Sequence, residues 1–296
     1  MKSRRKTLNL VMDGIDLYNT AYEDLSPTRT ITPTKRSCFR DLVKNMFTSE
    51  YDDVLKQNEK NLRNSSAKLC GFLKNPKEVN NIPTYIDNAV FNIILDILTD
   101  KQNIRSYFDC KKMYHHYTTL AKIAFKNDDH NTCIVIKCAL EHTVIKRLDI
   151  KQTKSEKRLF EEFEQTYGTF LNCYSKHIEQ LLTSHGTILD FIPSVLVLNM
   201  HLKKNEIYTD AYTKLGKYPK KLAEKRAHLM KVMDAYGQYY VSYRKFLVRL
   251  YLVDPMQHSV FTSGKYKGGF TETLFEMVNE IHKNNNGKKK LKRNTI

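Results

Sequence analysis

Apolar residues return at three- and four-residue spacing through the middle of this chain, and that spacing limits its fold more than any other feature. The clearest stripe is Ile86, Ala89, Val90, Ile93, Ile94, Ile97 and Leu98, with Asp87, Asn92 and Asp96 expected to face away. Such spacing is that of an amphipathic helix, and Pro83 suits its first turn. Strand-like alternation never lasts more than about four residues. The sequence therefore predicts an all-α fold.

Further stripes extend the helical pattern on both sides of a polar turn. One comprises Cys110, Met113, Tyr114, Tyr117, Leu120, Ala121 and Ala124, and the next comprises Cys133, Ile136, Leu140, Val144 and Leu148. Asn127, Asp128 and Asp129 between them form a turn-forming cluster. Thr153 and Glu156 have the spacing of a capping box, which predicts a helix start there. We expect further helices over residues 170–182, from Pro219 to near Leu252, and over 271–282.

The same patterns divide the chain into four parts. Residues 1–35 are weakly patterned and are interpreted as an N-terminal arm, and residues 36–80 as N-terminal helices. Residues 81–283 form the main helical domain, and residues 284–296 form a basic tail. A chain of 296 residues that is 41% hydrophobic can bury a sizeable core, so a disordered chain is excluded.

Composition also indicates where in the cell the protein resides and which kinds of catalytic or metal site it lacks. No apolar run reaches the roughly 18 residues of a spanning helix, and Asp13 and Asp16 interrupt the segment where a cleaved signal would need apolar residues. None of the six cysteines forms a CxxC pair, so we expect reduced thiols and a cytoplasmic protein. Cys110 lies near His115 and His116 without a second ligand cluster. We expect no metal, no cofactor and no hydrolase or transferase site.

The formal net charge of +17 calls for a partner or another explanation. Much of it lies at the two ends, in Lys2, Arg4, Arg5 and Lys6, and in Lys288, Lys289, Lys290, Lys292 and Arg293. Solvated tails are the first interpretation and contact with an anionic membrane the second. Nucleic acid comes third, because the dense aromatic and basic stretch from Tyr236 to Tyr251 is better explained by core packing.

An ordered series of short motifs runs from Pro83 to Leu252. They are Ile123-Ala124 before the polar loop, Asn131 at its end, Val135-Ile136 and Leu140, Arg147-Leu148, Phe160 to Phe163, Ile192-Pro193, and Leu222 to Arg226 with Tyr239. In order and spacing this series resembles the catalytic domain of Ras-type guanine-nucleotide exchange factors. The resemblance implies a multi-helix orthogonal bundle with a protruding helical hairpin, and residues 36–80 could then be a reduced form of that family's bracing module.

The resemblance also implies a function that needs no covalent chemistry by the protein. A hairpin starting near Pro193 would open the nucleotide pocket of a small Ras-superfamily GTPase, with Asn199, His201, Leu202, Lys203 and Glu206 on its working face. Glu206 and Asp210 are the acids placed to meet the GTPase's P-loop lysine. Ser194, Tyr174 and Leu140 would lie near the groove for switch II. Asn131 and Arg147 are expected to be structural, as a loop cap and as a tie between helices.

The hairpin departs from the family pattern, and this leaves alternatives open. Leu196, Leu198, Met200 and His201 stand where the family has Gly, Tyr, Thr and Asp. A divergent exchange factor is favoured over a scaffold that binds a GTPase or another partner without exchange. An unrelated basic helical protein that binds anionic membrane or nucleic acid is a third hypothesis. A single module without regulatory domains would suit a signalling effector that an intracellular microbe delivers into a host cell.

Overall fold

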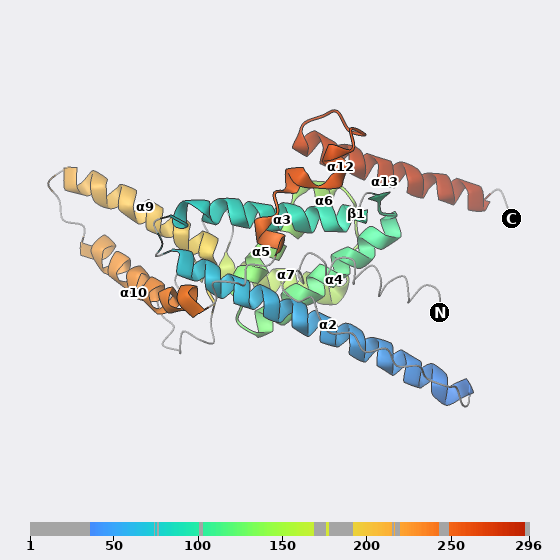
Figure 1. Cartoon of the computed structure of the whole chain (residues 1–296), viewed down its shortest axis with the longest axis horizontal. Helices are drawn as coiled ribbons and strands as arrows, with labels where there is room; N and C mark the ends of the chain where they lie inside the picture. The colour runs from blue at the N-terminus through green and yellow to red at the C-terminus, as the bar shows by residue number, and fades with distance from the viewer. Residues whose placement is uncertain are drawn as a thin grey trace.

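The all-α prediction is confirmed in the computed structural model (Figure 1), which describes residues 36–73, 75, 77–100, 103–168, 176–177, 192–214, 216, 220–242 and 249–293. Side chains are described for these residues except 36–50, 212, 232–242 and 287–293. The α-helices are α2 (Arg36–Phe72), α3 (Ile82–Leu98), α4 (Tyr107–Lys126), α5 (His130–Glu141), α6 (Thr143–Lys146), α7 (Lys154–Tyr167), α9 (Val195–Lys214), α10 (Lys220–Ser242), α11 (Arg249–Leu252), α12 (Ser259–Thr262) and α13 (Phe270–Arg293). Short 3₁₀ turns η1 (Val79–Asn81) and η3 (Pro255–Gln257) join them, with a small hairpin of β1 (Thr99–Asp100) and β2 (Asn103–Ile104).

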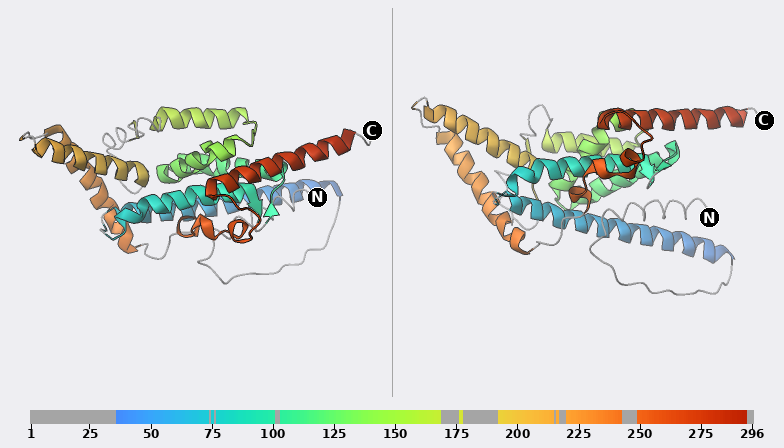
Figure 2. Two further views of the ribbon diagram at one scale, coloured as in Figure 1. Left: turned by 90° about the horizontal axis from the view of Figure 1, so that it is seen from above. Right: turned by 45° about the horizontal axis from the view of Figure 1, so that its top comes forward.

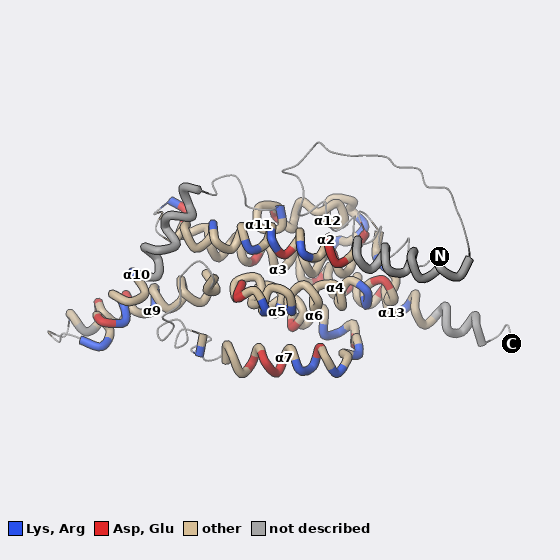
Figure 3. Tube along the Cα trace, turned by 90° about the horizontal axis from the view of Figure 1, so that it is seen from below, with Lys and Arg blue, Asp and Glu red and all other residues tan. Residues whose placement is uncertain are grey.

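The core lies around α3, which contacts α4, α5, α9 and α11. The long helix α2 contacts α4, α5, α9 and α10. Figure 3 shows α7 on the far side of α4 and α5 from α2 and α3. At one end of the molecule α9 and α10 stand out as a pair, while the start of α2 and the end of α13 point the other way (Figures 1 and 2).

The predicted stripes on α3, α4 and α5 are buried throughout, but two of the three polar assignments on α3 are wrong. Asp87 is exposed as expected, whereas Asn92 and Asp96 are buried. Asn92 Nδ2 donates to the Leu250 and Val253 carbonyls at 3.0 and 2.8 Å, which ties α11 to α3. The reason is that neighbouring helices cover α3 on several sides, so its polar side chains must find partners inside the protein.

The Asp96 carboxylate accepts hydrogen bonds from two other buried side chains. It accepts from Tyr117 Oη at 2.7 Å and from Arg105 Nη2 at 3.3 Å. Burial raises the pKa of this carboxyl, and Arg105 and Tyr117 act in the opposite direction. A buried carboxylate with these two partners is stable only as part of the set, because an unpaired buried charge is costly.

Two predicted helices differ from the structure in their boundaries. The helix expected to bury Cys133 to Leu148 is divided at His142 into α5 and α6. The last helix, α13, begins at Phe270 and continues to Arg293, so the predicted basic tail of residues 284–296 is helical over most of its length. The helix expected over residues 170–182 lies outside the described residues except for 176–177, and so does the continuation of α10 through 243–248. None of the described helices is long and apolar enough to cross a membrane.

Candidate functional site

The helices α9 and α10 contact each other and are here called the hairpin. Asn205 of α9 donates from Nδ2 to the Leu222 carbonyl of α10 at 3.1 Å. The Glu206 carboxylate lies 3.8 Å from Arg226 Nη2, and both side chains are about half exposed. These contacts join the middle of α9 to the first turns of α10, so the two helices hold a defined relative position.

The base of the hairpin is fixed by hydrogen bonds to the α4–α5 turn. His130 N donates to the Ile192 carbonyl at 2.9 Å, and Ile192 N donates to the Asp128 carbonyl at 2.8 Å. Asp128 adopts a left-handed backbone with φ 53°, as the predicted turn requires. The segment just before α9 is therefore held like a short parallel strand against this turn.

The first turn of α9 is capped by buried side chains from elsewhere in the chain. Asn131 Oδ1 accepts from Val195 N at 3.1 Å, and His177 Nε2 accepts from Ser194 N at 3.0 Å. Ser194 Oγ accepts from Val197 N at 3.4 Å. Amide groups at a helix start have no partner within the helix, so these acceptors supply what the helix lacks.

A buried polar cluster surrounds that cap, and the sequence analysis did not identify it. The Asp129 carboxylate accepts from Thr132 N and Thr132 Oγ1 at 3.1 and 2.6 Å, and from Ser66 Oγ of α2 at 3.4 Å. Asn131 Nδ2 donates to Ser66 Oγ at 3.1 Å and lies 3.4 Å from Tyr251 Oη. Burial raises the pKa of Asp129, and the hydrogen bonds from Thr132 and Ser66 act in the opposite direction. The cluster joins α2, α5, α9 and α11 at one point.

Three aromatic side chains lie beside this cluster. His130 Nδ1 is 2.9 Å from Tyr167 Oη, and the His177 ring packs against both residues. Burial lowers the pKa of His130 to about 4, with Arg63 acting in the same direction. His130 is therefore neutral near pH 7.

One stripe of α9 collects most of the hairpin residues predicted from the resemblance. Asn199, Lys203, Glu206 and Asp210 follow at spacings of four, three and four, and Leu202 precedes Glu206 by four. We call this set of five residues the contact stripe. Lys203, Glu206 and Asp210 are exposed, Leu202 is half-buried, and Asn199 is buried near the base.

His201 does not belong to the contact stripe. It precedes Asn205 by four residues, and Asn205 faces α10, so His201 lies on the inward side of α9 and is buried. Ser194 and Leu140, predicted near a partner groove, are also buried. Ser194 instead caps α9, and Leu140 packs in the core. Tyr174 lies outside the described residues.

The two residues predicted to be structural have clear contacts. Asn131 lies in the first turn of α5 rather than in the preceding loop, and it caps α9 rather than its own backbone. The Arg147 guanidinium lies 4.0 Å from the centre of the Phe275 ring, and the Arg147 carbonyl accepts from His282 Nε2 at 2.8 Å. Arg147 therefore joins the end of α6 to α13.

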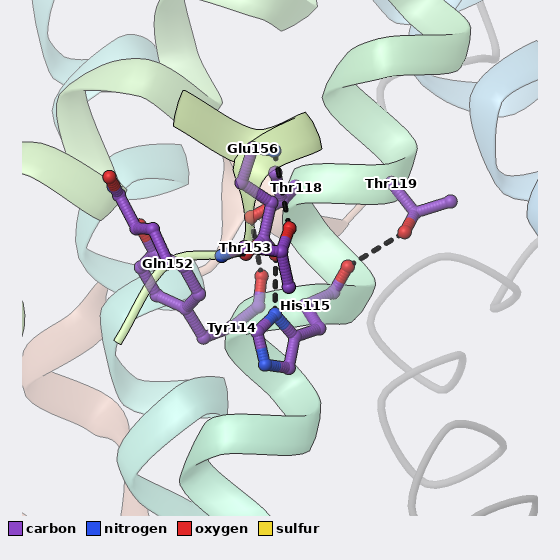
Figure 4. Close-up of polar contacts among 7 residues, drawn as sticks. All are labelled: Tyr114, His115, Thr118, Thr119, Gln152, Thr153 and Glu156. Carbon is purple, nitrogen blue, oxygen red and sulfur yellow. Dashed lines mark hydrogen bonds and ion pairs between the residues drawn. The ribbon is translucent and has the colours of Figure 1, made fainter. Parts of the chain in front are cut away.

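Of the two histidines near Cys110, His115 belongs to the junction of α4 with α7 (Figure 4), whereas His116 Nδ1 lies 3.2 Å from Tyr51 Oη of α2. Thr153 and Glu156 form the predicted capping box, and the Glu156 carboxylate also contacts His115 Nδ1. Gln152 Nε2 donates to Tyr114 Oη at 2.8 Å in the same junction. Within the described residues, no group of three or more His, Cys, Asp or Glu side chains could hold a metal ion. These side chains hold two helices together.

No protein-family model matches this chain, and no curated protein matches it. The functional interpretation therefore depends on the residues and on the geometry of the hairpin.

Proposed function

We propose that this chain is a guanine-nucleotide exchange factor for a small Ras-superfamily GTPase and that the hairpin opens the nucleotide site. The observation that carries the proposal is the placement of the contact stripe. Lys203, Glu206 and Asp210 form one exposed row on a helix that stands out from the body. A hairpin so placed can enter a partner's cleft while the rest of the domain stays outside.

The mechanism follows from differential affinity. A hairpin that fits the nucleotide-free GTPase better than the loaded form shifts the equilibrium toward release, and the size of the shift equals the difference in binding free energy. Glu206 supplies a carboxylate that can pair with the lysine that otherwise holds the nucleotide phosphates. Asp210, one turn further along α9, is the second available carboxylate. The base is rigid because Asn131, His177 and Ser194 cap α9.

Glu206 is already paired with Arg226 in the free chain, at 3.8 Å and half exposed. An exposed pair of this kind contributes little stability, roughly 0–1 kcal/mol. The carboxylate can therefore exchange Arg226 for a partner's lysine at small cost.

Charge reversal at Glu206 tests the proposal. With a GTPase that responds, we expect Glu206→Lys to slow release of a fluorescent guanine nucleotide about tenfold or more, since one charge-assisted contact contributes about 1.5–3 kcal/mol. Glu224→Lys is the matched control, because Glu224 is an exposed acid of α10 that pairs with Lys220 at 4.0 Å. Normal exchange by Glu206→Lys, or equal loss in both variants, would remove Glu206 from the mechanism.

A second candidate function is a scaffold that binds a GTPase without releasing its nucleotide. Burial of Asn199 and His201 favours it, because these residues occupy positions that the resemblance assigns to the working face. Stable binding of a nucleotide-free GTPase without accelerated release would support the scaffold. Either function would place the chain in a cytoplasm, and delivery into a host cell by an intracellular microbe is part of the same proposal.

A further inference from the structure

The side of α9 that turns away from the contact stripe carries a mixture of basic and apolar residues. It comprises Lys204, Ile207, Tyr208, Ala211 and Lys214, which follow one another at helical spacing. Ile207 is 68% exposed and Tyr208 is 46% exposed, among the largest exposures of apolar side chains in the described residues. Lys204 Nζ lies 5.8 Å from the centre of the Tyr208 ring.

Helix α10 extends this surface with a second basic row. Lys221, Lys225 and His228 follow at spacings of four and three, and none of the three is buried. The Glu206–Arg226 contact places Arg226 on the same side as the contact stripe. Lys221 and Lys225 do not share the row of Arg226, because neither is three or four residues from it. We call the two rows together the basic face.

Three acidic side chains of the hairpin are described. Glu206 and Asp210 are on the contact stripe, whereas Glu224 pairs with Lys220 and lies between Lys221 and His228 in the α10 row, at spacings of three and four. Figure 3 shows Lys and Arg along both helices of the hairpin. The basic face therefore carries four lysines and one acid, with exposed apolar side chains among its lysines.

We propose that the basic face binds an anionic lipid membrane. Lysines attract anionic headgroups, and Ile207 and Tyr208 can enter the boundary between headgroups and acyl chains. A nucleic acid would use the lysines and Tyr208, but it would gain nothing from an exposed aliphatic side chain such as Ile207. The mixture on this face therefore favours a lipid surface.

The placement of the two surfaces makes this arrangement possible. The hairpin stands at one end of the molecule, so its basic face can approach a flat surface (Figures 1 and 2). The contact stripe, on the other side of α9, would remain free to hold a partner protein. The inference depends only on the hairpin and not on the proposed exchange activity.

Sedimentation of the full chain with phosphatidylcholine vesicles, with and without phosphatidylserine, tests the proposal. We expect binding to vesicles that contain phosphatidylserine and little binding to the others. Lys204→Ala with Lys221→Ala should weaken binding about 30-fold, since each lysine near a membrane surface contributes about a factor of five. Ile207→Ser should also weaken binding, without any change of charge.

Lys157→Ala with Arg158→Ala is the matched control. Both residues are exposed on α7, and this variant has the same net charge as the hairpin variant, because each lowers +17 by two to +15. We expect its binding to stay within about twofold of the unaltered chain. Equal loss in the two variants, unchanged binding by Ile207→Ser, or binding to nucleic acid but not to vesicles would overturn the proposal.

An assay of nucleotide release from a GTPase without its lipid anchor separates the exchange proposal from the membrane proposal, because no membrane takes part in it. The double hairpin variant should retain solution exchange, because neither lysine belongs to the contact stripe. Loss of vesicle binding with normal exchange would support the basic face as a separate surface. Loss of solution exchange would instead place Lys204 and Lys221 in a protein interface and contradict the lipid assignment.

Discussion

Asp129 is fully buried at the point where α2, α5 and the segment before α9 meet. It caps α5 through Thr132 N and also accepts from two hydroxyl groups. Removing it leaves Thr132 Oγ1 and Ser66 Oγ with fewer acceptors in a site without exposed surface. At the scale of single residues, this carboxyl is therefore more important to stability than an exposed acid of equal charge.

Asp129→Ala should lower the free energy of unfolding by about 2–4 kcal/mol, from a lost cap and unsatisfied buried partners. Urea denaturation measures this loss. The control is Asp53→Ala, because the Asp53 side chain is 73% exposed, and we expect a change within about 0.5 kcal/mol. Similar effects of the two variants would contradict the assignment.

The free energy of unfolding should depend on pH through the protonation of the buried histidine His116. Burial lowers the pKa of His116 to about 4, against about 6.5 in an unfolded chain. Its contribution is therefore present above about pH 6.5 and is lost as pH falls toward 4, because the unfolded chain takes up the proton first.

Between pH 7 and pH 5, His116→Gln should lose about 2 kcal/mol less stability than the unaltered chain. The variant is compared with the unaltered chain because Asp129 also titrates in both. Burial raises the pKa of Asp129, so its contribution to stability changes with pH in the opposite direction to that of His116 and cancels in the difference. Urea midpoints at the two pH values provide the measurement. Parallel pH profiles would show that His116 is not the group that titrates.

At the scale of elements, the start of α9 is capped by side chains that come from other parts of the fold. Asn131 reaches it from α5 and His177 from residues 176–177. Helix α7 begins with the capping box that the sequence predicts, so it is held by local residues. Helix α9 is held by residues far away in sequence, and its position therefore depends on tertiary structure.

Asn131→Ala should loosen α9 more than the core. We expect hydrogen-exchange protection at Val195 and the next turn to fall about tenfold to a hundredfold, because Val195 N loses its acceptor. Amides in the middle of α3 serve as the control and should keep their protection. An equal fall in α3 and α9 would mean that the residue supports the whole fold rather than this helix.

How far the sequence predicted these features depended on the range of each interaction. The stripes of α3, α4 and α5 and the Thr153–Glu156 capping box are local patterns, and the structure confirms them. Asn92 and Asp96 were assigned to the wrong environment because a single-face pattern cannot show that a helix is covered on several sides. The Asp129 cluster was missed because its members come from distant segments. The extension of α13 was missed because a lysine run was interpreted as a solvated tail.

At the scale of the whole molecule, the hairpin and the ends of α2 and α13 project in opposite directions (Figure 1). Contacts from α2, α3 and the α4–α5 turn meet at the base of α9, so the body supports the hairpin without covering its outer part. This arrangement leaves a supported helix projecting from the body. It is the feature of the structure that best supports the exchange proposal.

The most direct test is release of a fluorescent guanine nucleotide from Ras, Rap, Ral, Rab, Rho and Arf GTPases, each with and without this chain. The account predicts accelerated release from at least one of them, and that GTPase would be the substrate. Unchanged release across the panel, together with no binding to any nucleotide-free GTPase, would contradict it.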